Sequence, residues 1–214
     1  MTLRLHHAPL ACSLASRLAL LEAGLEHEIA FVHTTRGEHL TQAYGRINPR
    51  RKVPALETAQ GVITESTAIL PYIADQAPER ALLPPPGGYE RAIAQSWLSF
   101  ISSSVHTAFS GVMGAERFAT DPAGVEAVRA GHLGLLAGAL GVLDAHLADR
   151  EFMLDAFSVC DLYLLVFLIW RAGPATAGRL PTLPNLDAFQ QRMLARPGLM
   201  AVLGEEMKLR AEAV

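Results

Sequence analysis

The sequence predicts an α/β half followed by an all-helical half. The first eighty residues alternate between short strand-like and helix-like segments. A run of prolines and glycines at 82–88 (LLPPPGG) then interrupts the chain, and three consecutive prolines cannot lie inside a helix. After this run the apolar residues recur with helical spacing only. We therefore expect domains at residues 1–81 and 89–214, joined by a linker at 82–88.

The elements of the first half begin with a strand and a helix. Residues 3–6 alternate as a short strand, and 14–23 have helical composition up to Gly24, a residue typical of a helix C-cap. Residues 28–32 (EIAFV) alternate and include β-branched and aromatic side chains, which predicts a second strand. A short helix is expected at 41–46.

The rest of the first half predicts a hairpin and a helix. Residues 55–58 and 62–64 flank a glycine turn at Gly61. Residues 66–76 then form a helix, with Ser66 as its expected N-cap. A strand–helix–strand unit implies parallel strands with a right-handed crossover, and the hairpin adds an antiparallel edge. The expected sheet is therefore mixed and four-stranded.

Long helical patterns occupy the second half, at 89–113 and 125–147. The second has an apolar stripe with i, i+4, i+7, i+11 spacing, formed by Leu136, Leu140, Leu143 and Leu147. It also holds four glycines, each costing roughly 1 kcal/mol relative to alanine, at Gly131, Gly134, Gly138 and Gly141. We expect close helix packing there, and flanking charges disfavour the alternative of a membrane dimerisation motif.

Composition limits the function classes. The chain has 214 residues, 50% of them hydrophobic, and a formal net charge of -3, which argues against electrostatic binding of nucleic acid. Its longest uninterrupted apolar run, 162–170, is far shorter than the ~20 residues of a membrane span. Two cysteines cannot build a disulfide framework and suit a reducing compartment. We expect a cytoplasmic protein that binds neither membranes nor nucleic acid.

The segment around Cys12 is the first candidate for chemistry. Cys12 lies between the first strand and the first helix, where the positive end of a helix dipole favours thiolate over thiol. A small buried apolar cysteine is the alternative reading. Ser13 is a rival nucleophile or hydrogen-bond donor, although serine is also an ordinary N-cap. No second cysteine follows at CxxC spacing, so the loop has no dithiol redox pair.

Two further segments suit a peptide-like ligand. Val53-Pro54 precedes a strand, where an extended peptide can pair with free backbone groups. Glu65 precedes the helix that opens at Ser66; the helix start suits a carboxylate and Glu65 an ammonium group. The alternative is a capped helix with a solvated glutamate. Ser158 and Asp161 have capping-box spacing ahead of an apolar helix, so we interpret them, with Cys160, as structural.

Taken together and in this order, these segments resemble the cytosolic glutathione transferases, and in particular the bacterial beta class. The resemblance spans essentially the whole chain. Its matching stretches are 9–15, 48–49 with 53–56, 64–66 with 68–69, 97–106 and 158–161. It implies a thioredoxin-like glutathione-binding domain, an all-helical electrophile-binding domain, and a homodimer formed through the helix that begins near Tyr89. The implied function is glutathione S-transferase activity in detoxification, with glutathione as co-substrate and no metal.

The resemblance also implies roles for single residues. Cys12 would lie beside the glutathione sulfur, Val53 would pair with the cysteinyl backbone with Pro54 cis, and Glu65 and Ser66 would take the γ-glutamyl end. His106 would line the cleft, on a helical stripe with Ser99 and Ser103, and Ser99 of the partner subunit would reach the ligand. The glycine carboxylate would meet Arg36 or Lys52, two alternatives left open.

Three expectations concern the reaction. Glutathione would be activated as a thiolate and would attack a hydrophobic electrophile, held against an apolar wall of Val105, Phe109, Val112 and Met113. Thr107 follows His106 where the beta class often has a basic residue, which weakens the expected positive potential. The alternatives are a glutathione-dependent disulfide or peroxide reductase, a dehalogenase, an isomerase, or a non-catalytic glutathione-binding module.

Overall fold

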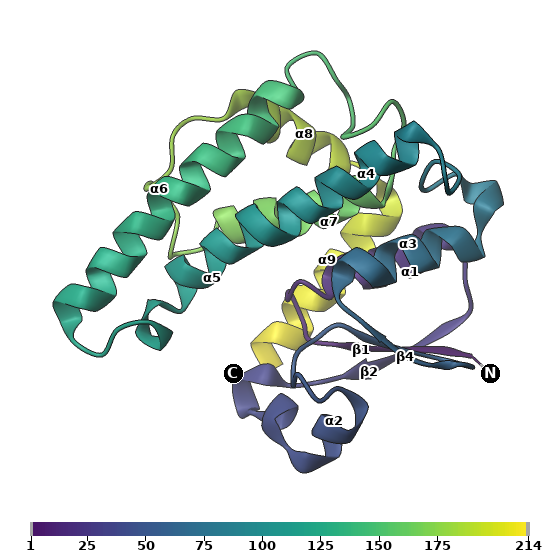
Figure 1. Ribbon diagram of the computed structural model, residues 1–214, viewed down its shortest axis with the longest axis horizontal. Helices are drawn as coiled ribbons and strands as arrows, with labels where there is room; N and C mark the ends of the chain where they lie inside the picture. The colour runs from purple at the N-terminus through teal and green to yellow at the C-terminus, as the bar shows by residue number, and fades with distance from the viewer. Residues whose placement is uncertain (1, 213–214) are drawn as a thin grey trace.

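The computed structural model describes residues 2–212. Within these residues, a four-stranded sheet with three α-helices forms the N-terminal part, and six α-helices form the C-terminal part (Figure 1). This arrangement confirms the predicted fold class, with a thioredoxin-like mixed sheet preceding an all-helical half.

The sheet has the strand order β2-β1-β3-β4. β1 pairs with β2 in parallel and with β3 antiparallel, and β3 and β4 form the hairpin. The strands are β1 (Leu3–His7), β2 (His27–Phe31), β3 (Ala55–Thr58) and β4 (Gly61–Thr64). Each lies within one residue of its predicted bounds, because alternation and the glycine turn are local signals.

Helices cover the two faces of the sheet unequally. α1 (Leu14–Ala23) and α3 (Ser66–Gln76) lie together on one face, and α2 (Gln42–Ile47) lies on the other (Figure 1). α1 ends at Gly24, which has the left-handed φ of 65° that the predicted C-cap requires. The end of β1, the start of β3 and the end of β4 lie side by side, and the chain passes from β1 toward α1 and from β4 into α3 at this edge of the sheet.

The helical part begins with one long rod. α4 (Tyr89–Phe100), a π-helical stretch at Ile101–His106, and α5 (Thr107–Met113) follow without a break. The remaining helices are α6 (Pro122–His146), α7 (Val159–Arg171), α8 (Pro184–Leu194) and α9 (Pro197–Glu212). π-helical turns inside α-helices occur frequently at functional sites.

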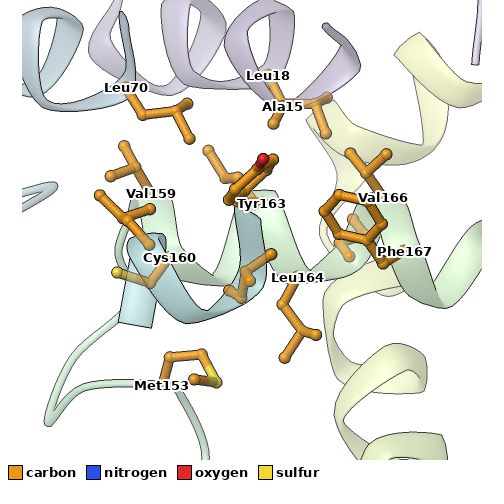
Figure 2. Packing of buried hydrophobic residues seen from close by; sticks show 14 of the residues in the cluster. Ala15, Leu18, Leu70, Met153, Val159, Cys160, Tyr163, Leu164, Val166 and Phe167 are labelled. Atoms are coloured by element: carbon orange, nitrogen blue, oxygen red, sulfur yellow. The ribbon is translucent and has the colours of Figure 1, made fainter. Parts of the chain in front are cut away.

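α7 lies at the centre of a core shared by both parts. Figure 2 shows Val159 of α7 beside Leu70 of α3, and Tyr163 and Val166 of α7 beside Leu18 and Ala15 of α1. The predicted capping box closes its N-terminus, because Asp161 Oδ2 accepts hydrogen bonds from the Ser158 amide at 2.7 Å and the Ser158 hydroxyl at 2.9 Å. Cys160 beside it is fully buried, and burial raises the pKa of its thiol to about 12.

α6 confirms one prediction and overturns another. Its predicted leucine stripe is buried, but its four glycines do not pack closely. A Cβ built at Gly131, Gly134, Gly138 or Gly141 meets no heavy atom within 4 Å among residues 2–212. The glycines lie on the side of α6 that faces away from the rest of the chain, so helix packing inside the chain does not explain them.

The same helix is long and apolar enough to cross a membrane by length and composition. Its apolar window has a mean hydropathy of 1.2 and is 17% buried. Our expectation from the longest uninterrupted apolar run did not detect this helix, because glycines, alanines and single polar residues divide it. Small residues raise the mean hydropathy without forming a continuous apolar surface, so this property alone is weak evidence of a span.

Candidate active site

A cavity of about 210 Å³ lies where the two parts meet. Its walls come from the loop before α1, the loop before β3, the start of α3, the rod at α4–α5, and α7. The lining residues are Cys12, Asn48, Lys52, Val53, Pro54, Glu65, Ser66, Ser102, His106, Thr107, Ser110 and Tyr163. Seven of the eleven site residues named from the sequence are among them.

Cys12 lies just before α1, with its thiol donating to the Val53 carbonyl at 3.3 Å. Burial raises the pKa of this thiol to about 11, although backbone hydrogen bonds at Cys12 and Ser13 act in the opposite direction. The expected lowering of this pKa by the helix dipole is therefore wrong for the Cys12 thiol, because desolvation of the thiolate outweighs the nearby amides. At neutral pH Cys12 is a neutral hydrogen-bond donor.

The loop before β3 contains a cis peptide bond between Val53 and Pro54. Two side chains hold the carbonyl of Lys52, since Tyr44 Oη donates to it at 2.8 Å and Asn48 Nδ2 at 2.6 Å. These bonds fix the backbone immediately before the cis bond. The loop therefore presents Val53 at the cavity in a defined position.

The start of α3 differs from its predicted form. Glu65, with a φ of 71°, is the N-cap, and Ser66 is the first helical residue. Within residues 2–212 no side chain caps this helix end, so the first amide groups of α3 remain available to an anion at the positive end of the helix. Glu65 lines the cavity with its side chain 58% exposed, and its carboxylate accepts from Arg50 Nη1 at 2.6 Å.

His106 enters the cavity from the π-helical stretch. Its ring packs against Phe167 and Trp170, with centroid distances of 5.1 and 5.5 Å. Burial, followed by the charge of Lys52, lowers the pKa of His106 to about 4. The imidazole is therefore neutral at physiological pH.

The π-helical stretch changes which serines accompany His106. A π-helix has more residues per turn than an α-helix, so the predicted i, i+4, i+7 stripe does not hold. Ser102 and Ser110 line the cavity with His106, whereas Ser99 and Ser103 are exposed and lie outside its lining.

Two other predicted residues lie away from the cavity. Ser13 is fully buried, and its hydroxyl lies 2.8 Å from His7 Nδ1 and accepts from the Ala8 amide at 3.2 Å. Arg36 is exposed and donates to the Glu212 carbonyl at 2.9 Å. Of the two candidates for the glycine carboxylate, only Lys52 lines the cavity.

The predicted apolar wall is part of the core instead. Val105, Phe109 and Val112 are buried, and Phe109 packs 5.7 Å from Trp170 between ring centroids. Met113 is 54% exposed. The apolar face of the rod is buried against α7, which leaves polar side chains such as Thr107 and Ser110 facing the cavity.

Sequence reasoning missed several lining residues, of which Tyr163 is the most informative. Tyr163 lies in an apolar run of the sequence, where a tyrosine is expected to be a core residue. The packing of α7 against α1 and α3 brings it to the cavity (Figure 2). Burial raises the pKa of its hydroxyl, so this group stays protonated. Asn48 had a detectable signal, since an Asn-Pro pair marks a turn.

Comparisons with known proteins agree with this geometry. The family description "Glutathione S-transferase, N-terminal domain" matches residues 1–75. Glutathione S-transferase GST-4.5 of Xanthomonas campestris pv. campestris is 32% identical over 207 residues, covering 95% of this chain and 98% of the relative.

Two solved structures extend the likeness to the whole fold. A sphingomonad glutathione S-transferase complexed with glutathione is 36% identical with a TM-score of 0.81. A beta-class enzyme from Sphingomonas chungbukensis is 36% identical with a TM-score of 0.80. Each comparison covers 95% of this chain and 98% of the other. The chain therefore belongs to the glutathione S-transferase family and is a glutathione transferase, an enzyme of the EC 2.5.1.18 type.

Proposed function

We propose that the cavity between the two parts binds glutathione and stabilises its thiolate for attack on an electrophile. The observation that carries this proposal is the meeting of Cys12, the Val53-Pro54 loop, the open start of α3 and His106 around one cavity. Binding of glutathione is supported by related structures that contain it. The thiolate is the attacking species, so the chain's contribution is to stabilise that anion and to orient it.

Each wall of the cavity has one role in this proposal. The first amides of α3 and Ser66 bind the γ-glutamyl carboxylate, and Glu65 binds the ammonium group. Val53 pairs with the cysteinyl backbone. Lys52 meets the glycine carboxylate.

Cys12 then acts as a donor. Because its pKa is raised to about 11, its neutral thiol can turn its one proton from the Val53 carbonyl to the glutathione sulfur, and is not suited to attack. The same property disfavours the alternative of disulfide reduction through Cys12, which requires a thiolate. We therefore favour conjugation over the reductase alternatives.

The direct test is ultraviolet difference absorbance of bound glutathione as a function of pH. We expect the pKa of the bound thiol to lie at least about one unit below its value in water, because the site favours the anion. Arg36→Ala is the control, since Arg36 lies outside the cavity. A bound thiol that titrates as it does in water would contradict the activation step.

A paired activity assay separates conjugation from reduction. Conjugation of an aryl halide is measured beside reduction of hydroxyethyl disulfide, for the natural chain and for Cys12→Ser. We expect conjugation in both proteins, since a serine hydroxyl also donates a hydrogen bond. Turnover of the disulfide alone would contradict the proposal.

The electrophile and the domain limits are also proposals. We propose that residues 1–81 bind glutathione and that 89–214 supply the electrophile side, with 82–88 as the linker. Met113 is the exposed apolar side chain of the predicted wall, and it remains our candidate for contact with a hydrophobic electrophile. We further propose a cytosolic location, in keeping with two free cysteines, Cys12 and Cys160.

We propose that a second copy of the chain pairs with the first through α4, the helix that begins at Tyr89. The Tyr89 side chain is 75% exposed, so the chain itself leaves this end of α4 uncovered. Ser99 is exposed on the same helix, so Ser99 of the partner subunit remains a candidate contact to the ligand.

Size-exclusion chromatography with light scattering tests this assembly. Tyr89→Glu should yield a folded monomer, because Tyr89 is exposed and its replacement leaves the core intact. Arg46→Ala, away from α4, serves as the control. A dimer that persists in Tyr89→Glu would contradict the proposed interface.

A further inference from the structure

A buried ionic cluster connects the loop around the active site to the last helix. His7 ends β1, Arg17 lies on α1, and Glu206 lies on α9. Figure 1 shows α9 passing from the helical part to the end of the sheet. The side chains of His7 and Glu206 have no solvent exposure. This contact therefore joins segments about two hundred residues apart in the sequence.

Every oxygen of the Glu206 carboxylate has a partner. Oε1 lies 2.7 Å from His7 Nε2 and also accepts from the Arg17 guanidinium, while Oε2 accepts from the Leu10 amide at 2.7 Å. A buried carboxylate is costly unless it is paired and hydrogen-bonded. These interactions hold the pKa of Glu206 below its ordinary value despite burial.

Leu10 is held from both sides by the helical part. Its amide donates to Glu206, and its carbonyl accepts from Trp170 Nε1 at 2.8 Å. Leu10 has a φ of 56°, a left-handed conformation that is unfavourable for a residue with a Cβ and that persists only where the surroundings impose it. The residue lies two positions before Cys12, so its conformation determines where the Cys12 thiol points.

His7 extends the same cluster to the other end of the loop. Its Nδ1 lies 2.8 Å from the Ser13 hydroxyl, which also accepts from the Ala8 amide. The order Ser13, His7, Glu206 is that of a hydrolytic triad, but Ser13 is fully buried and is not among the residues that line the active-site cavity. The cluster therefore holds the loop and does not supply a nucleophile.

We propose that Glu206 and Trp170 are positioning residues for the thiol site, acting through the backbone of Leu10. In this arrangement α9 sets the conformation of residues 8–13, and that conformation sets how strongly the site ionises bound glutathione. The inference rests on the proposed function of the cavity. It adds a requirement that the last helix be docked for the thiol to be activated.

The test compares Glu206→Gln with Glu205→Gln in the full chain. Both glutamates pair with Arg17, but Glu205 is half exposed and does not contact the loop, which makes it a matched control. We expect Glu206→Gln to lower kcat/KM for glutathione about 10- to 100-fold, as displacement of a supporting group does. The pKa of the bound thiol should return toward its value in water, and amide exchange of residues 8–13 should accelerate. Glu205→Gln should stay within about 2-fold of the natural chain.

Trp170→Phe provides a second variant if Glu206→Gln fails to fold. It keeps an aromatic ring beside Phe109 and Phe167 and removes the donor to Leu10. The same shift of the bound thiol's pKa, in the same direction, is expected. A pKa and kcat/KM that stay at the natural values in both variants, even with lowered thermal stability, would overturn the inference. If the natural chain itself fails to lower the thiol pKa, the proposed function fails before any variant is compared.

Discussion

The N-termini of α3 and α7 are built from similar residues and have different roles. Each combines a serine with a carboxylate, Glu65 with Ser66 at α3 and Ser158 with Asp161 at α7. At α7 the two side chains bond to each other and to the first turn. At α3 the carboxylate faces Arg50 and leaves the first turn uncapped among the described residues.

Spacing is the physical reason for this difference. An acid three residues after the N-cap reaches back to the N-cap amide, as Asp161 does. An acid at the N-cap directly before the serine cannot make that reciprocal contact, and Glu65 pairs with Arg50 instead. The N-terminus of a helix is thus available to a ligand only where its first amide groups have no hydrogen-bond acceptor within the chain.

The largest expected effect is on stability, when the capping carboxylate at the N-terminus of α7 is removed. Asp161→Ala should lower the free energy of unfolding by about 2–3 kcal/mol, because it leaves the buried amides of Met153 and Ser158 without an acceptor. Urea unfolding measures the change. Asp155→Ala is the control, since Asp155 is 98% exposed. A loss below about 0.5 kcal/mol, as for an ordinary surface change, would remove the contrast with α3.

The pH dependence of stability sharpens the same contrast. Burial raises the pKa of Asp161 to about 6. Between this pKa and the lower pKa of an aspartate in the unfolded chain, the native state keeps a proton on Asp161 and the unfolded state does not. The stability that this group contributes therefore falls by about 3 kcal/mol as pH rises from about 4 to 6. Asp161→Asn should lose this dependence. Glu206 has a lowered pKa and contributes the opposite slope, so each variant is compared with the natural chain at every pH.

At the uncapped N-terminus of α3, the expected effect is on the binding of glutathione. Glu65→Gln should weaken glutathione binding about 10-fold, a loss of roughly 1.4 kcal/mol, by removing the partner of the ammonium group. The free energy of unfolding should change by less than about 0.5 kcal/mol, as for an exposed side chain. Calorimetric titration with glutathione measures the binding. Glu28→Gln is the matched control, because Glu28 is also exposed and paired with an arginine.

The smallest effect is expected for protonation of His106, which lines the cavity together with the start of α3. With its pKa lowered to about 4, this imidazole does not change charge between pH 5.5 and 8. The rise of kcat/KM over that range should therefore keep its midpoint in His106→Asn. A midpoint that moves in this variant would show that His106 titrates in the working range.

Much of the cavity lining was predictable because the sequence patterns that mark these residues span only a few positions. Cys12, Pro54, Glu65 and Ser66 each stand at the start or end of an element, and such positions are marked by turn and cap residues. Ser99 and Ser103 were misplaced because helical spacing assumes a regular α-helix, and the chain forms a π-helical stretch at that point. Ser13 was predicted to be a site residue but is buried, because His7 and α9 pack around it in the folded chain.

Local sequence signals predict the order of the elements, the break at the prolines and the capped start of α7. These features depend on residues within a few positions of one another. Packing across the whole chain keeps the Cys12 thiol neutral, places Val105 and Phe109 in the core, and brings Glu206 to the loop before α1. Burial and long-range contacts set these properties, since desolvation depends on all packed neighbours, and Leu10 and Glu206 meet only after α9 docks on the sheet.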